Sequence, residues 1–338
     1  MQGASILGFM SVAEWSPLSR RLDGLPATTW RGEVPGALVK PLRGWVDETL
    51  RVAPSPWGAG AHRIAERVLL RLDLVPPDAE VPEDDETDEE TVARDYLAYG
   101  TPVDLLPDVV DTVLYLLPVS LKVEATSFSK PLTSVVEVMA SMALSAAQNA
   151  GRWADSQRKE LSGLLDDALS ALRVQPGGRG LERRADVSAE AAFGEAVRSA
   201  AAATAAGSAA VLLREAWGCV HALHPDPVKA YAQAIKAVES AAHALVEPRN
   251  AKATLGTMLG HLRSHSDCFS LVIPGPAGKG DVGPLISCMT LLWDGQSSRH
   301  GSSRPTRDET LEEAAAAVHL AVTLVQWFTS GAVRRSAT

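Results

Sequence analysis

Arg299 and His300 are the two side chains in this sequence whose types and position most clearly favour chemistry. They lie in the segment 295–301, which separates two apolar segments. An arginine binds phosphate through a bidentate fork, and a histidine can transfer a proton near neutral pH. Metal-independent cleavage of RNA requires such groups, because it needs a base for the 2′-hydroxyl, an acid for the leaving oxygen and a cation for the phosphorane charge. The loop is therefore predicted to bind a phosphate-rich partner.

A predicted helix over 228–246 carries a second candidate group. Its apolar face is formed by Ile235, Val238, Ala242 and Leu245, and its polar stripe by Lys236, Glu239, Ser240 and His243. Such a stripe is either a solvent-exposed face of ion pairs or part of a site. In the second interpretation Glu239 pairs with Arg299 or His300 and orients it, since a carboxylate commonly fixes the tautomer of a histidine. Arg299, His300 and Glu239 are thus the predicted catalytic residues, with Lys236 and Arg304 as substrate-binding cations.

Other chemistries find little support among the sequence motifs. His261 and His265 could hold zinc together with Asp267 or Cys268, but no HExxH motif accompanies them. The glycine-rich segment 274–283 lacks the Walker spacing, and no serine nucleophile elbow is present. The three cysteines form no CxxC pair. We therefore expect neither a metal nor a cofactor.

The net charge of the 338-residue chain is −9. Proteins that coat nucleic acids non-specifically carry a broad basic face, so this charge argues against that class but permits a local basic pocket. No segment offers about 20 consecutive apolar residues, and the first ten residues lack a basic start and a long apolar core. The sequence is accordingly expected to be cytoplasmic and to contain no membrane span.

Helical periodicity without alternating strand patterns predicts an all-α protein. The predicted organisation is a helical N-terminal region over 1–75, an acidic linker over 76–91, a middle helical region over 92–180 and a helical bundle over 195–333. The linker is assigned from its dense negative charge, which cannot form a core.

Three local features are also predicted. Thr306 and Glu309 have the spacing of a capping box for the last helix. The buried seam of that helix is expected at Leu311, Ala315, Val318, Val322 and Val325. A nearly all-apolar helix, separate from a later one over 161–172, is expected to be buried through Leu132, Val135, Val136, Val138 and Met139.

Four motifs in the C-terminal part resemble, in order and spacing, the C-terminal domain of bacterial abortive-infection (AbiJ-type) proteins, a branch of the HEPN superfamily. The motifs are Asp226-Pro227-Val228-Lys229-Ala230, Ala234-Ile235-Lys236-Ala237-Val238-Glu239-Ser240, Thr254-Leu255-Gly256 and Arg299-His300-Gly301. The resemblance covers roughly 205–333. It implies an up-down HEPN-like bundle, a homodimer, a role in antiphage defence and a metal-independent RNA-cleaving or RNA-binding toxin.

The site motif departs from the pattern of this family. HEPN ribonucleases carry an arginine separated from a histidine by four to six residues, whereas Arg299 and His300 are adjacent. The only pair with the family spacing is Arg214 and His221. The alternative is therefore kept that the protein is a non-catalytic sensor or scaffold of a bacterial defence system, which binds a phage-derived trigger or a partner protein.

Overall fold

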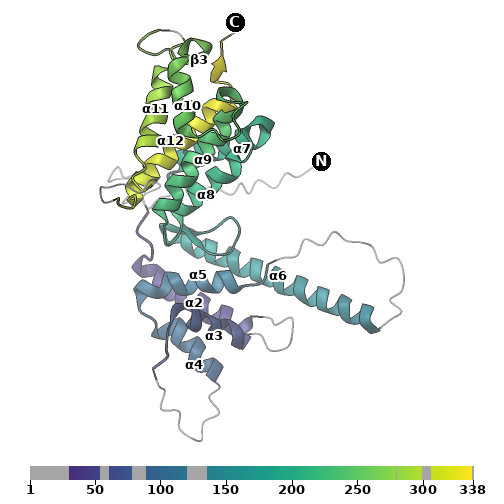
Figure 1. Cartoon of the computed structure of the whole chain (residues 1–338). Helices are drawn as coiled ribbons and strands as arrows, with labels where there is room; N and C mark the ends of the chain where they lie inside the picture. The colour runs from purple at the N-terminus through teal and green to yellow at the C-terminus, as the bar shows by residue number, and fades with distance from the viewer. Residues whose placement is uncertain are drawn as a thin grey trace, which may run out of the picture. The chain divides into compact units, whose positions relative to one another are not determined.

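The computed structural model describes residues 30–53, 61–77, 89–119, 135–278, 280–298 and 306–336. These residues are mostly helical, which confirms the all-α class. The strands in the described ranges form two short antiparallel pairs. The chain divides into two compact units, 1–184 and 185–338 (Figure 1).

The first unit is a group of helices closed by a small hairpin. Its elements are α2 (Gly36–Val52), α3 (Ala61–Leu72), α4 (Glu89–Asp95), the π-helix η2 (Tyr96–Gly100), the 3₁₀-helix η3 (Val103–Leu105), α5 (Leu106–Leu116), α6 (Val135–Asp167), β1 (Leu172–Val174) and β2 (Leu181–Arg183). Helices α2 and α3 pack against α4 and α5, so helices from both sides of the predicted acidic linker share one unit. Residues 78–88 of that linker lie outside the described residues.

A buried arginine joins the hairpin to the helices of this unit. Arg158 on α6 is 9% exposed, and its guanidinium donates to the carbonyl oxygens of Gly178 at 2.7 Å and Pro118 at 2.9 Å. Gly178 lies in the Gly/Pro-rich turn between β1 and β2, which are paired in antiparallel register. The charge is tolerated because these carbonyl groups and Asp155 occupy its donors.

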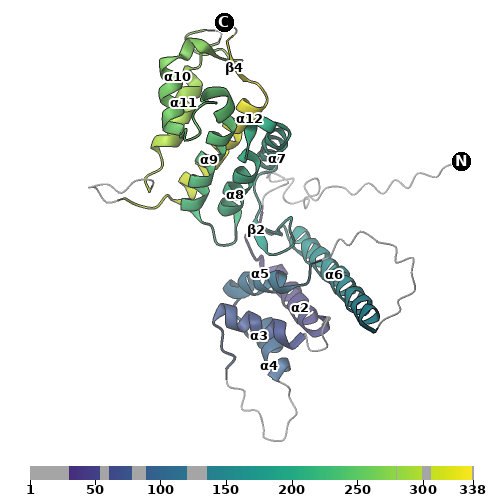
Figure 2. The same cartoon turned by 45° about the vertical axis from the view of Figure 1, so that its right-hand side comes forward.

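The predicted burial of the apolar helix is wrong at Met139, while Leu132 and the side chains of Val135, Val136 and Val138 lie outside the described residues. Figure 2 shows α6 as one continuous helix, so the two helices expected here are joined. Met139 is 65% exposed and Met142 67% exposed, and Ala150 is the first fully buried residue after them. No proline interrupts the segment 135–167.

The second unit is a helical bundle arranged around α9. Its elements are α7 (Val187–Ala202), the 3₁₀-helix η4 (Thr204–Ala206), α8 (Ala209–His221), α9 (Pro227–Val246), α10 (Leu255–Ser264), the 3₁₀-helix η5 (Ser266–Cys268), β3 (Phe269–Leu271), α11 (Gly283–Asp294), α12 (Leu311–Thr329) and β4 (Val333–Arg335). Helix α9 packs mainly against α8 and α12, while α10 lies beside α11 (Figure 1). Strand β3 pairs with β4 in an antiparallel ladder.

Two predictions for this unit can be compared with the structure. Asp226 caps α9 by accepting from the Lys229 amide at 2.9 Å, with Pro227 at the first position of the helix, as expected. The seam of α12 is only partly as predicted, because Val318, Val322 and Val325 are buried but Leu311 is 40% exposed. The remaining buried side chains of α12 are Ala314, Ala317, Ala321, Leu324 and Phe328.

Candidate functional site

Arg299, His300 and Arg304 lie outside the described residues, but the structure describes both ends of the segment that contains them. Ser297 and Ser298 follow α11, and the chain is described again from Thr306 to the start of α12. The contacts between these two ends decide how the segment is attached to the bundle.

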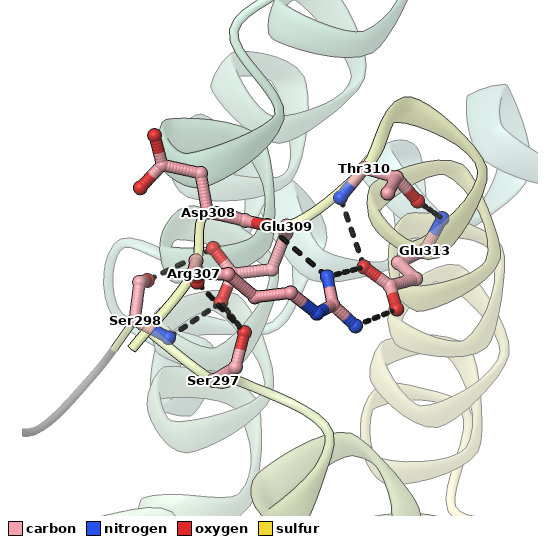
Figure 3. A network of polar contacts seen from close by, with 7 residues as sticks. All are labelled: Ser297, Ser298, Arg307, Asp308, Glu309, Thr310 and Glu313. Atoms are coloured by element: carbon pink, nitrogen blue, oxygen red, sulfur yellow. Dashed lines mark hydrogen bonds and ion pairs between the residues drawn. The ribbon is translucent and has the colours of Figure 1, made fainter. Parts of the chain in front are cut away.

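Glu309 is the residue that fastens the two ends together (Figure 3). Its side chain is buried at 3% exposure. The backbone amide of Ser298 donates to Oε1 at 2.8 Å, and the Ser298 hydroxyl donates to Oε2 at 2.8 Å. The Ser297 hydroxyl lies 2.9 Å from the Arg307 carbonyl oxygen and 3.3 Å from Glu309 Oε1, so it contacts both. Sequence reasoning missed this carboxylate as an anchor.

The surroundings of Glu309 keep it ionised. Burial raises the pKa of its carboxyl group and is the largest single influence, but the bonds from the Ser298 amide, the Ser298 hydroxyl and other donors together outweigh it. The net result is a pKa below the ordinary value. A buried carboxylate is stable only when its lone pairs are satisfied, so the charge of Glu309 requires Ser297 and Ser298 to stay in place.

The capping box of α12 is not the predicted one. Thr310 caps the helix by accepting from the Glu313 amide at 3.2 Å, and Glu313 accepts from the Thr310 amide at 2.9 Å. The sequence holds two Thr-x-x-Glu patterns, and Thr306 begins the one that is not used. Because Glu309 of the first pattern is held by the serines after α11, it cannot fold back to cap the helix. The Arg307 guanidinium also donates two hydrogen bonds to the Glu313 carboxylate, at 2.7 Å and 2.5 Å.

A pH-dependent contribution to stability is expected from Glu313. Hydrogen bonds from Arg307 and Thr310 lower the pKa of its carboxyl group from 4.5 to about 2. Because the folded-state pKa is the lower one, this contribution is present above pH 4.5 and is lost as the pH falls toward about 2. Urea unfolding should therefore show Glu313→Gln less stable than the wild type at pH 7, with a difference that shrinks between pH 4.5 and 3. Glu312→Gln, an exposed neighbour on the same turn, is the control and should show no such trend.

Glu239 is held at the beginning of α10. One of its oxygens, Oε1, accepts from the backbone amide of Leu255 at 2.6 Å. Leu255 is the first residue of α10, where amides lack partners within the helix and a negative charge is favourable. The predicted contact between Glu239 and Arg299 or His300 falls partly outside the described residues and stays a prediction.

The end of α11 brings the start of the Arg299/His300 segment toward the same part of the bundle. A Cβ on Gly256, in the first turn of α10, would lie 2.7 Å from Trp293 Cζ2. A Cβ on Gly295 would lie 2.4 Å from the Tyr231 hydroxyl on α9. These close approaches place the start of the segment near the helix end that Glu239 caps.

The polar stripe of α9 is the edge of this helix that remains at the surface. Lys236, Glu239, Ser240 and His243 line a hollow of about 320 Å³ together with Ala205, Gly207 and Ala253. The Ser240 hydroxyl donates to the Ala206 carbonyl oxygen and accepts from the Ser208 amide, both at 2.9 Å. His243 Nε2 donates to the Asn250 carbonyl oxygen at 2.9 Å. Through Ser240, Glu239 and His243 the stripe therefore binds the loop before α8, the first turn of α10 and the turn before α10.

The other candidate histidines stack on neighbouring rings. The rings of His261 and His265 stack with centroids 4.6 Å apart, and within the described ranges no three His, Cys, Asp or Glu side chains are grouped to hold a metal ion. His221 is 9% exposed and stacks on Trp217 at 4.3 Å, so packing occupies the histidine of the pair that has the family spacing.

None of the helices in the described part of the chain has both the length and the apolar character needed to cross a membrane. No family model, curated protein or solved structure matches the chain.

Proposed function

We propose that this protein is an antiphage toxin of the abortive-infection type, whose HEPN-like C-terminal bundle binds and cleaves RNA without a metal. The observation that carries the proposal is the attachment of the Arg299/His300 segment. Its two ends are joined by Glu309, whose carboxylate is 3% exposed and is held by Ser297 and Ser298. Burying a charged side chain costs free energy. Such a contact at the ends of a surface loop is therefore expected where the loop must keep a fixed geometry.

The chemical roles follow from the residue types. Arg299 binds the scissile phosphate and stabilises the charge that develops on it, while His300 transfers the proton. Glu239 orients one of them, and Lys236 and Arg304 bind neighbouring phosphates. The support from the structure is that Glu239 and the end of α11 approach the same helix terminus. A homodimer that brings two such segments together is part of the proposal, as is a cytoplasmic location.

A second candidate is a non-catalytic sensor or scaffold that recognises a phage-derived trigger or a defence partner. The observation that favours it is the first half of α6, where Met139 and Met142 are 65% and 67% exposed. Exposed methionines are adaptable contact residues at protein-binding surfaces. In this case the N-terminal unit binds the partner, and the C-terminal unit serves as a scaffold.

An RNA-degradation assay with the purified chain and His300→Ala distinguishes the two candidates. A catalytic protein degrades RNA in the presence of a divalent-metal chelator and loses this activity on substitution. If neither protein degrades RNA, either in phage-infected cells or after infected-cell extract is added, the sensor or scaffold becomes the preferred function.

A further inference from the structure

Helix α9 and its carboxyl end carry cations that form no ion pair with any carboxylate in the described ranges. They come from α9, from the turn after it and from β4, and they make up a basic group of four exposed side chains: Lys236, Arg249, Lys252 and Arg335. Elsewhere in this unit arginines do pair with glutamates, as Arg198 pairs with Glu195 at 2.7 Å. An exposed cation without a carboxylate partner is available to an anionic ligand.

The turn between α9 and α10 holds the backbone of two of these cations in place. His243 Nε2 donates to the Asn250 carbonyl oxygen at 2.9 Å, and the Asn250 side chain accepts from the Lys252 amide at 3.2 Å and donates to Glu247 at 2.9 Å. The side chains of Arg249 and Lys252 themselves form no hydrogen bond with any part of the chain that the structure describes. Both cations therefore extend into solvent from a fixed base.

Arg335 reaches the same end of α9 from β4. Its guanidinium donates to the carbonyl oxygens of Leu245 at 2.9 Å and Val246 at 3.4 Å, and it lies over the ring of Phe269 at 5.4 Å from the centroid. The last carbonyl groups of a helix lack partners within the helix and carry partial negative charge, so this contact stabilises α9. It also places a cation directly before the turn that carries Arg249.

Two carboxylates near the basic group bind the start of α10. Glu239 Oε1 accepts from the Leu255 amide at 2.6 Å, and Glu247 accepts from the Thr257 hydroxyl at 3.0 Å. Leu255 and Thr257 belong to the first turn of this helix, where the helix dipole contributes about half a positive charge. Helix α10 thus partly balances both carboxylates, so the end of α9 keeps a positive potential although the whole chain has a net charge of −9.

Lys236 extends the basic group along α9. It lies ten residues before Val246, which is about 15 Å at the helical rise of 1.5 Å per residue. Tyr231, which Gly295 at the start of the Arg299/His300 segment approaches closely, lies five residues before Lys236. The cations are therefore distributed along the direction that leads from this segment to the turn after α9. Such a distribution matches the repeated phosphates of a strand better than one small anion.

We propose that the basic group binds the sugar–phosphate backbone of a single RNA strand. The inference rests on the proposed function and deepens it, because it states where the substrate continues beyond the Arg299/His300 segment. Contacts to phosphates fix the position of a strand and add affinity without reading its sequence. The basic group should therefore strengthen the binding of RNAs of different sequence alike.

The salt dependence of RNA binding by the full chain tests the assignment. The probe is a fluorescently labelled single-stranded 2′-O-methyl RNA, which keeps the phosphates but lacks the attacking 2′-hydroxyl, and its anisotropy is measured at several potassium chloride concentrations. Each phosphate contact to a single strand contributes about 0.7 to the slope of log affinity against log salt concentration. The double variant Arg249→Gln/Lys252→Gln should therefore lower that slope by about 1.4.

Arg214→Gln/Lys229→Gln is the matched control. It removes one arginine and one lysine from exposed positions of the same unit, on α8 and in the first turn of α9, outside the basic group. Its slope should equal that of the wild type. The Tm of both double variants should stay close to the wild-type value, because all four side chains are exposed.

The outcomes separate this surface from the proposed catalysis. Equal slopes for the two double variants would overturn the assignment, as would a loss of affinity in Arg249→Gln/Lys252→Gln that is limited to one RNA sequence. Cleavage of ordinary RNA by the wild type is measured separately. If the slope falls as expected while the wild type does not cleave RNA, the basic group stands as an RNA-binding surface and the catalytic proposal fails alone. If RNA is cleaved while the slopes are equal, the basic group fails alone.

Discussion

Replacing His300 with alanine is expected to lower the rate of RNA cleavage by about 100- to 10,000-fold, the usual contribution of general acid–base catalysis. His300 is the only histidine in the segment between α11 and α12, so no neighbour in that segment can take over its proton transfer. The measurement is the initial rate of cleavage of a labelled RNA by the wild type and the variant, each with and without a divalent-metal chelator. The chelator should leave the wild-type rate unchanged.

Two companion variants make this result specific. His265→Ala removes an exposed histidine that stacks on His261 in the same unit, and it should cleave at the wild-type rate. Arg299→Ala should weaken RNA binding, because it removes a bidentate phosphate contact. If His300→Ala cleaves RNA and protects cells from phage as well as the wild type does, catalysis at this segment is excluded and the sensor or scaffold becomes the preferred function.

Replacing Glu309 with alanine is expected to destabilise the C-terminal unit by about 2 kcal/mol, because several hydrogen bonds to a charged group are lost and their donors are only half-buried. Thermal unfolding at pH 7 measures the loss. For a unit of this size, that change corresponds to a fall in Tm of roughly 4 to 8 °C. Glu312→Ala is the control, since its carboxylate is exposed on the first turn of α12, and it should change Tm by far less.

Glu309 should also affect activity without contacting the substrate. If it positions the Arg299/His300 segment, Glu309→Ala lowers kcat for RNA cleavage at temperatures where the variant remains folded. A variant with lowered Tm but unchanged kcat would show that the anchor serves stability alone.

The elements that the sequence predicted well are those whose signals are local. The start of α9 was predicted from Asp226 and Pro227, since a capping side chain and a proline act within one turn. The all-α class followed from periodicity in the same way. Both properties depend on residues only a few positions apart, so no knowledge of tertiary packing was needed.

The failures concern interactions between distant residues. Thr306 and Thr310 each begin a Thr-x-x-Glu pattern, and the choice between them depends on Ser297 and Ser298, about ten residues earlier in the chain. Similarly, the bond that Glu239 accepts from the Leu255 amide across a turn could not be found from periodicity, while its predicted contact with Arg299 or His300 stays a prediction. Met139 looked like a core residue because its neighbours are apolar, but burial depends on what packs against the helix.

Helix α9 sets the spacing between three neighbouring segments of the C-terminal unit. Ser240 fixes the loop before α8, Glu239 fixes the first turn of α10, and His243 fixes the turn between α9 and α10. All three attachments share one edge, so their spacing is set by the 1.5 Å rise and 3.6-residue turn of a helix. A single alanine inserted after Lys236 would rotate the later part of the edge by about 100° and would detach the loop, the turn and the neighbouring helix together. A single substitution along α9 thus alters one attachment at a time, whereas a change in the length of the helix displaces all three.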